Sequence, residues 1–107
     1  ELRVFGEEQR LDSYVEIGLF RIIQEAVNNV EKHAKANTAK VAIEFRKESV
    51  IAAVEDDGVG FDTASSTGSE SSGLLGMKER VSLLKGDFIV KSEKGSGTRI
   101  VVKLNLR

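Results

Sequence analysis

Apolar residues recur at three- and four-residue steps between Ser13 and about Ala36, which is the spacing of a helix that buries one face. Ser13 and Glu16 stand three residues apart, as in a capping box, and mark the expected start of this helix. The pattern therefore predicts one long amphipathic helix. The residues of its predicted buried stripe are Ile22, Ile23, Ala26, Val27 and Val30.

A second, shorter helix is predicted from Leu74 to Lys85, with Gly86 as its stop. Its core candidates include Leu75, Val81 and Leu84. Short runs of alternating or β-branched residues predict strands, with a turn at Glu48-Ser49 between the second and the third. These runs are Leu2 to Phe5, Ala39 to Phe45, Val50 to Val54, Phe88 to Val90 and Arg99 to Leu106.

The order of these elements is strand, helix, hairpin, loop, helix, hairpin. It predicts an α+β fold, a two-layer sandwich with helices packed on a mixed, mostly antiparallel sheet. The loop before the second helix includes the polar run from Thr63 to Ser72, which offers too little apolar surface to pack. We therefore expect this loop to be flexible.

Composition narrows the class of protein. The 107 residues, with no cysteine, proline or tryptophan, suit one compact domain. A net charge of -1 argues against an electrostatically driven partner such as nucleic acid or an anionic membrane. The lack of cysteine excludes disulfides and thiolate chemistry, and it fits a cytoplasmic location. The chain shows no signal peptide or membrane span and starts with Glu1, so we expect a domain of a longer protein.

The predicted long helix carries a polar strip. Glu25, Asn29 and His33 are spaced four residues apart, and Lys32 lies one step to the side. Oxygen donors beside a cation suit a magnesium ion bound to phosphates, to which Lys32 and His33 can donate hydrogen bonds. Taken alone, such a strip is more often a solvated helix face.

A second cluster, from Asp56 to Gly60, directly follows a predicted strand. Gly58 and Gly60 let the backbone turn sharply and a flat ligand approach closely. A carboxylate at the end of a strand can accept a hydrogen bond from an exocyclic amine such as that of adenine. An ordinary acidic turn explains these residues equally well. Neither the dinucleotide fingerprint nor the phosphate loop of P-loop proteins occurs in the chain.

Two further segments are rich in glycine. The segment from Ser72 to Met77 is predicted to open the second helix, where exposed amides suit phosphate groups. A plain glycine cap fits the same residues. The segment from Gly95 to Thr98 by itself predicts a hairpin turn into the last strand.

The order of the four segments resembles the nucleotide-binding boxes of the GHKL ATPase superfamily, which includes gyrase, Hsp90, MutL and sensor histidine kinases. Its members carry patterns like Glu25-x-x-x-Asn29, Asp56-x-Gly58-x-Gly60, the Gly73/Gly76 segment and Gly95-x-Gly97-Thr98. Three stretches narrow the resemblance to the catalytic domain of bacterial histidine kinases of the DegS, LiaS and DesK type. They are Arg21 to Ala26, Lys32 to Ala34 and Gly76 to Val81.

The resemblance implies the Bergerat fold over a single domain, residues 1–107, with a flexible ATP lid at about residues 62–72. It implies that Asn29 holds Mg²⁺, that Glu25 lies at the metal's water shell, and that these two residues are catalytic. Asp56 would receive the adenine amino group. Relatives often have glycine where this chain has Ser71, so the lid contacts can differ. The residues expected to contact ATP are Asn29, Lys32, His33, Asp56, Gly58, Val59, Gly60, Phe61, Ser72, Gly73, Leu74, Leu75, Gly76, Met77 and Thr98.

The implied function is that of a catalytic module that binds Mg·ATP and delivers the γ-phosphate to a histidine on a separate dimerisation domain. His33 is the only histidine and belongs to the predicted ATP site, so we do not expect it to be the acceptor. A response regulator would be an indirect partner, and the isolated domain is expected to be a monomer. Three alternatives remain: a serine kinase of the anti-sigma-factor type, an ATP-gated interaction domain, and a structural domain without a ligand. The segment from Gly76 to Arg80 favours the histidine kinase.

Overall fold

The computed structural model describes residues 2–6, 11–30, 38–59, 69–93 and 95–105. Their strands form one five-stranded sheet in the order β1-β2-β3-β5-β4. Only β1 pairs in parallel, with β2, and the other neighbours are antiparallel. The elements are β1 (Leu2–Phe5), α1 (Ser13–Asn29), β2 (Ala39–Phe45), β3 (Ser49–Asp56), α2 (Ser69–Leu83), β4 (Asp87–Ser92) and β5 (Thr98–Asn105).

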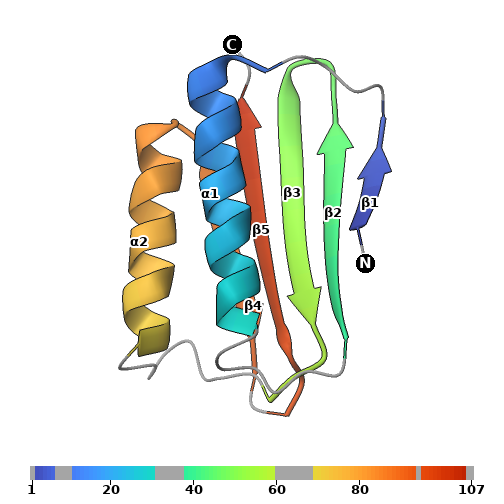
Figure 1. Ribbon diagram of the computed structural model, residues 1–107, viewed down its shortest axis with the longest axis vertical. Coiled ribbons are helices and arrows are strands. Elements are labelled where there is room, and N and C mark those ends of the chain that lie inside the picture. Colours follow the sequence, from blue (N-terminus) through green and yellow to red (C-terminus); the bar gives the residue numbers. More distant parts are fainter. Residues whose placement is uncertain (1, 7–10, 31–37, 60–68, 94, 106–107) are drawn as a thin grey trace.

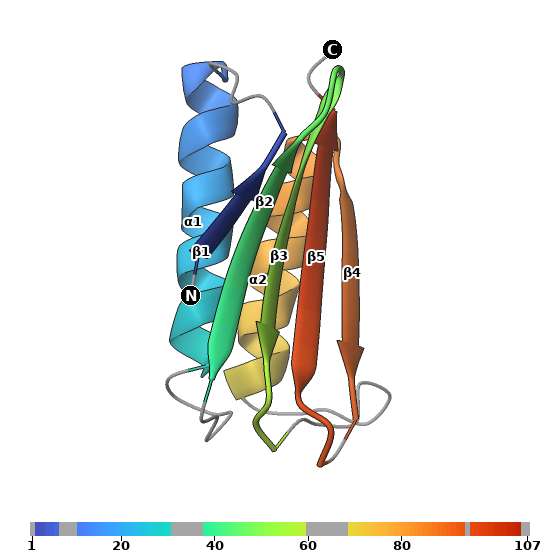
Figure 2. The same ribbon diagram turned by 90° about the vertical axis from the view of Figure 1, so that its right-hand side faces the viewer.

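Both helices pack against the same face of the sheet, as Figures 1 and 2 show. The predicted α+β sandwich is therefore confirmed, with its mixed, mostly antiparallel sheet. Of the two described helices, neither combines the length and the apolar character needed to cross a membrane.

The core lies between the helices and the sheet. From Val50 in β3 and from Ile100 in β5, every second residue is buried, the alternation expected of a sheet covered on one face. Ile22 of α1 and Val81 of α2 are each only 1% exposed, so both helices seal the core. The buried apolar residues are Leu19, Ile22, Ala26, Val50, Ala52, Val54, Met77, Val81, Ile100, Val102 and Leu104.

The start of α1 differs from the capping-box prediction. The cap is Asp12, whose carboxylate accepts the Tyr14 N–H at 2.9 Å, and Ser13 is the first helical residue. Asp and Ser are comparable caps, and the spacing alone did not decide between adjacent candidates. The predicted extension of this helix to Ala36 falls mostly on residues 31–37, which lie outside the described residues.

Both ends of α2 also differ from the prediction. The helix begins at Ser69 rather than Leu74, within the range expected for the lid. At its other end Lys85, not Gly86, has the left-handed backbone (φ 57°). The N–H groups of Lys85 and Gly86 donate to the carbonyls of Ser82 and Val81, closing a Schellman motif. Gly86 is required by packing instead, because a Cβ there would lie 2.5 Å from Leu104 Cδ2.

Candidate functional site

The ends of four elements gather at one end of the molecule. In Figures 1 and 2, α1 and β3 finish at this end, and α2 and β5 start there. The last residue of α1 is Asn29, the last residue of β3 is Asp56, and β5 begins with Thr98. The topology therefore brings residues from three of the four predicted boxes to the same end of the sandwich.

Asp56 occupies a buried corner at this end. Its side chain follows Val54 on the helix-covered face of β3, and the residue is only 8% exposed. Its Oδ1 accepts the buried Gly58 N–H at 2.8 Å, which offsets part of the cost of burying a carboxylate. Among the described residues no donor reaches Oδ2, so this oxygen is free to accept a hydrogen bond from a ligand.

Thr98 lies directly opposite Asp56 in the β3–β5 pair and opposite Ser92 in the β4–β5 pair. The Ser92 hydroxyl donates to the Gly97 carbonyl at 3.0 Å, and its oxygen lies 2.8 Å from the Thr98 hydroxyl oxygen. Because a hydroxyl has one proton, Thr98 donates to Ser92 and keeps acceptor capacity beside Asp56. Ser92 was not among the predicted site residues, because the predicted strand from Phe88 to Val90 ended before it, whereas β4 extends to Ser92.

Gly97 brings the β4–β5 turn against the end of β3. It has a φ of +78°, and a Cβ at this position would lie 2.2 Å from the Asp56 carbonyl oxygen. A groove of about 490 Å³ opens beside this contact, and its walls include Asp56, Ser92, Gly97 and Thr98. We call these four residues the Asp56 corner. The shape of the Asp56 corner is fixed by backbone contacts, which leave no room for a side chain at Gly97.

The loop after β3 is held from two sides. Thr38 and Asp57 bond reciprocally: the Thr38 N–H donates to Asp57 Oδ1 at 2.9 Å, and the Asp57 N–H donates to the Thr38 carbonyl at 3.4 Å. On the other side, the Gly95 N–H donates to the Val59 carbonyl at 2.6 Å. Gly58 is buried, whereas Val59 is 48% exposed and available to a ligand. The predicted contacts Gly60 and Phe61 lie outside the described residues.

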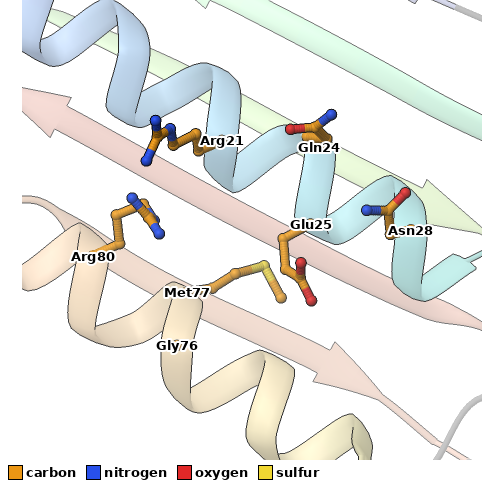
Figure 3. A pocket seen from close by; sticks show the side chains of 7 residues that line it. All are labelled: Arg21, Gln24, Glu25, Asn28, Gly76, Met77 and Arg80. Atoms are coloured by element: carbon orange, nitrogen blue, oxygen red, sulfur yellow. The ribbon is translucent and has the colours of Figure 1, made fainter.

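The polar strip of α1 is described only in part. Glu25 and Asn29 are half-buried, one turn apart, at the end of α1. Glu25 lines a groove of about 520 Å³ between α1 and α2 together with Gly76 and Met77, and its carboxylate points into that groove beside Met77 (Figure 3). Lys32 and His33 lie outside the described residues.

The two side chains at the end of α1 fit a magnesium ion that takes most of its ligands from water and phosphate rather than from the protein. Glu25 and Asn29 offer a carboxylate and an amide oxygen, both hard donors. The described part of the chain has no group of three His, Cys, Asp or Glu side chains arranged to hold a metal. Mg²⁺ usually takes one or two protein ligands and completes its shell with water and phosphate, so this small set suits it.

The residues of α2 that were predicted to contact ATP differ in their exposure and in their distance from the start of the helix. Ser72 and Gly73 lie within the first five residues, so the free backbone amides belong to Ser69–Ser72 rather than to Gly73. Leu74 packs against the core, and Met77 is only 2% exposed. Leu75 is 57% exposed and faces solvent.

Comparison with known proteins identifies the family of the chain. Residues 14–107 match the family described as histidine kinase-, DNA gyrase B- and HSP90-like ATPase. The chain is 45% identical over 102 residues to the signal transduction histidine-protein kinase/phosphatase DegS of Bacillus subtilis (strain 168) and 41% identical over 105 residues to DegS of Brevibacillus brevis. These alignments cover 94% and 97% of this chain but only 26% and 27% of the relatives.

Among solved structures, the histidine kinase AdeS of Acinetobacter baumannii superposes with a TM-score of 0.78 at 19% sequence identity. The superposition covers all of this chain and 53% of the other. That likeness confirms the fold, and the sequence match confirms the predicted superfamily. The chain belongs to the family of histidine kinase-, DNA gyrase B- and HSP90-like ATPases.

Proposed function

We propose that this chain is the ATP-binding catalytic domain of a two-component sensor histidine kinase and passes the ATP γ-phosphate to a histidine on a separate dimerisation domain. The observation that carries the proposal is the Asp56 corner, a buried carboxylate with one free oxygen at the end of a strand. The relatives that span nearly the whole chain are named histidine kinases. The chain spans about a quarter of their length, so the acceptor and the response regulator belong to the proposal.

Adenine recognition would centre on Asp56. Its Oδ2 accepts the exocyclic amine while Oδ1 stays bonded to the Gly58 amide, so the carboxylate is already oriented before the ligand arrives. The exposed Val59 and the acceptor side of Thr98 flank this position. Gly60 and Phe61 complete the proposed base contacts.

The phosphates would lie toward the end of α1. Asn29 and Glu25 would hold the magnesium ion directly and through water, and Mg²⁺ supplies neutralisation of phosphate charge when bound. Lys32 and His33 are the proposed donors to phosphate oxygens. The amides of the first turn of α2 face the same end of the molecule and suit an anion. The residues at about 62–72 remain the proposed lid.

The domain's own contribution to phosphoryl transfer would be positioning, because imidazole is already a competent nucleophile. A buried base site and the proposed metal site at the end of α1 would hold the nucleotide at two points, which would orient the γ-phosphate for an acceptor supplied from outside. The chain alone is therefore expected to bind ATP without phosphorylating itself.

The test is a titration of the chain with ATP, followed by backbone NMR with and without Mg²⁺. Shifts should concentrate at the amides from Asp56 to Val59 and at Thr98, and the magnesium-dependent part should concentrate near Asn29. Shifts confined to the outer face of the sheet would contradict the adenine assignment.

A second measurement separates the kinase from an ATP-gated binding domain. The chain is mixed with [γ-³²P]ATP and with a purified dimerisation domain from a DegS-type kinase, and acid-labile phosphohistidine is counted. Phosphorylation of the added domain supports the proposed transfer. Nucleotide binding without any transfer would leave the binding site standing and contradict the kinase assignment.

A further inference from the structure

Two pockets that share Arg21 and Arg80 lie between α1 and α2 and are treated together as one groove; the larger also contains Glu25, Gly76 and Met77 of the proposed nucleotide site. The polar part of the groove has a volume of about 520 Å³, its apolar part a volume of about 220 Å³, and Arg21 and Arg80 line both parts. The approach of the helices is close, since a Cβ on Gly18 would lie 2.6 Å from Leu84 Cδ1. We call this feature the helix groove.

The apolar part of the helix groove has a hydrophobic rim that is open to solvent. Tyr14 and Ile17 of α1 are 65% and 55% exposed, and Leu83 of α2 is 73% exposed. Gly18 and Leu84 lie between them as the floor. Three large apolar side chains around one depression are more than scattered surface residues, and such a patch is typical of a binding surface.

Two guanidinium groups meet at the middle of the helix groove. Figure 3 shows Arg21 and Arg80 extending toward one another from the two helices. Glu25 stands four residues after Arg21, a spacing that allows an ion pair, yet its carboxylate points along the groove toward Met77. Within the described part of the chain, neither guanidinium has an ion pair. Two like charges that converge without a counterion favour an anion between them.

The apolar part of the groove favours an anion other than a phosphate of the proposed nucleotide. Arg21 lies eight residues before Asn29, which at about 1.5 Å per residue places it roughly 12 Å back along α1. The apolar rim lies still further from the nucleotide end, because Tyr14 and Ile17 precede Arg21 on α1. An anion at the arginines that also covers this rim must carry apolar groups with it.

We propose that the helix groove binds an amphipathic helix of a protein partner, whose apolar face covers Tyr14, Ile17 and Leu83 and whose carboxylate is held by Arg21 and Arg80. Arginine pairs carboxylates in a fixed, two-pronged geometry, so the two arginines set the register of the bound helix. The groove between two helices is a recurring site for a third, read through residues one turn apart. The inference rests on Arg21, Arg80 and the apolar part of the groove, which contains none of the residues proposed to hold the nucleotide.

The experiment uses a fluorescent synthetic helix of about 16 residues, long enough to be partly helical in water. It carries leucines at i, i+3, i+4 and i+7 and one glutamate beside that stripe, and a matched peptide has glutamine instead. Fluorescence anisotropy measures binding to the chain. The glutamate peptide should bind at least tenfold more tightly than the glutamine peptide.

Variants assign the effect to the arginines. Arg21→Gln/Arg80→Gln should weaken the glutamate peptide at least tenfold and leave the glutamine peptide unchanged. Lys47→Gln/Lys103→Gln removes the same charge outside the groove and should change neither. Arg21→Glu/Arg80→Glu should prefer a lysine-bearing peptide over the glutamate peptide, a reversal that a purely structural role of the arginines would not produce.

Several results would overturn the proposal. Equal affinity for the glutamate and glutamine peptides, or loss of binding in the lysine control pair, would remove the carboxylate contact. If neither peptide binds, the proposal that the groove accepts an amphipathic helix is contradicted. A dimer in sedimentation that Arg21→Gln/Arg80→Gln dissociates would make a second copy of this chain the occupant instead. Melting temperatures of all variants check that each one is folded.

Discussion

The Asp56 corner and the helix groove are two depressions built in opposite ways. The corner is made of strand ends and turns: Asp56, Thr98 and Ser92 lie in one row of the sheet, and Gly97 presses backbone against backbone. The helix groove is made of side chains that two helices extend toward solvent and toward each other.

The difference bears on what each depression can bind. A corner held by register and by the 2.8 Å bond from Gly58 to Asp56 is oriented before any ligand arrives, which suits a small rigid base. The groove's arginines and exposed rim have rotamers to choose from, so the groove can adapt to a surface that is itself irregular. Rigid backbone would suit the proposed nucleotide site, and adaptable side chains would suit the proposed partner.

The strongest test of the rigid corner is Gly97→Ala. The new Cβ would meet the Asp56 carbonyl, and the positive φ adds a strain of about 1–2 kcal/mol. We expect a loss of at least about 2 kcal/mol in the free energy of unfolding, and loss of nucleotide binding. Gly95→Ala is the matched control, since Gly95 has a similar φ of +84° but nothing within 4 Å of a Cβ. Equal destabilisation in urea unfolding would show that the corner is no tighter than an ordinary turn.

The next test removes the acceptor without changing shape. Asp56→Asn keeps an oxygen for the Gly58 amide but turns a donor toward the adenine amine. Nucleotide affinity should fall at least tenfold, which corresponds to about 1.4 kcal/mol. Asp87→Asn is the control, because Asp87 is an exposed carboxylate at the opposite end of β4 from Ser92. Calorimetry on both variants checks this, and an unchanged affinity in Asp56→Asn would remove the adenine assignment.

Asn29→Ala tests the proposed metal end of the site, which lies on α1 rather than on the sheet. Removing the amide oxygen should abolish the magnesium dependence of ATP binding, while binding without magnesium changes by less than about twofold. Asn28→Ala, on the adjacent residue that lines the helix groove, serves as the comparison. If the magnesium dependence persists in Asn29→Ala, the metal is held elsewhere.

The smallest effect is expected at Gly76, on the floor of the helix groove. A Cβ there meets nothing within 4 Å, and alanine is a better helix former than glycine by about 1 kcal/mol. Gly76→Ala should therefore raise the melting temperature by a few degrees, as differential scanning fluorimetry would show. Gly18→Ala gives the contrast, because its Cβ would be 2.6 Å from Leu84 Cδ1. The cost of moving that side chain should offset the gain in helix propensity. A gain at Gly18 equal to that at Gly76 would show that the helices are not in tight contact.

The apolar periods were enough to predict the sandwich, because one buried stripe and several alternating runs leave few other ways to bury those faces. The ends of elements were harder to predict. Asp12 and Ser13 are both good caps one residue apart, and the polar start of α2 at Ser69 has no apolar period to reveal it. Local pattern does not separate such neighbours, since the choice depends on packing along the rest of the helix.

In the candidate site, too, some residues could be predicted from local sequence patterns and others could not. Asp56 and Thr98 were predicted from motif order, and the sheet register places them opposite each other. The roles of Ser92 and of the Arg21–Arg80 pair were not predicted, because they depend on which strand and which helix become neighbours. That information lies in the tertiary arrangement, not in the spacing of residues along the chain.

The central pairing of β3 with β5 has a consequence for the order of folding. The β2–β3 and β4–β5 hairpins are local, whereas joining β3 to β5 closes a long loop that contains α2. Such closures are slow because the loop entropy is lost before the new contacts form. We therefore expect the hairpins to appear first in refolding, and the opposition of Asp56 and Thr98 to arise only when the two halves of the sheet zip together. On this view a nascent or partly folded chain lacks the proposed nucleotide site, and ligand binding would select molecules that have finished folding.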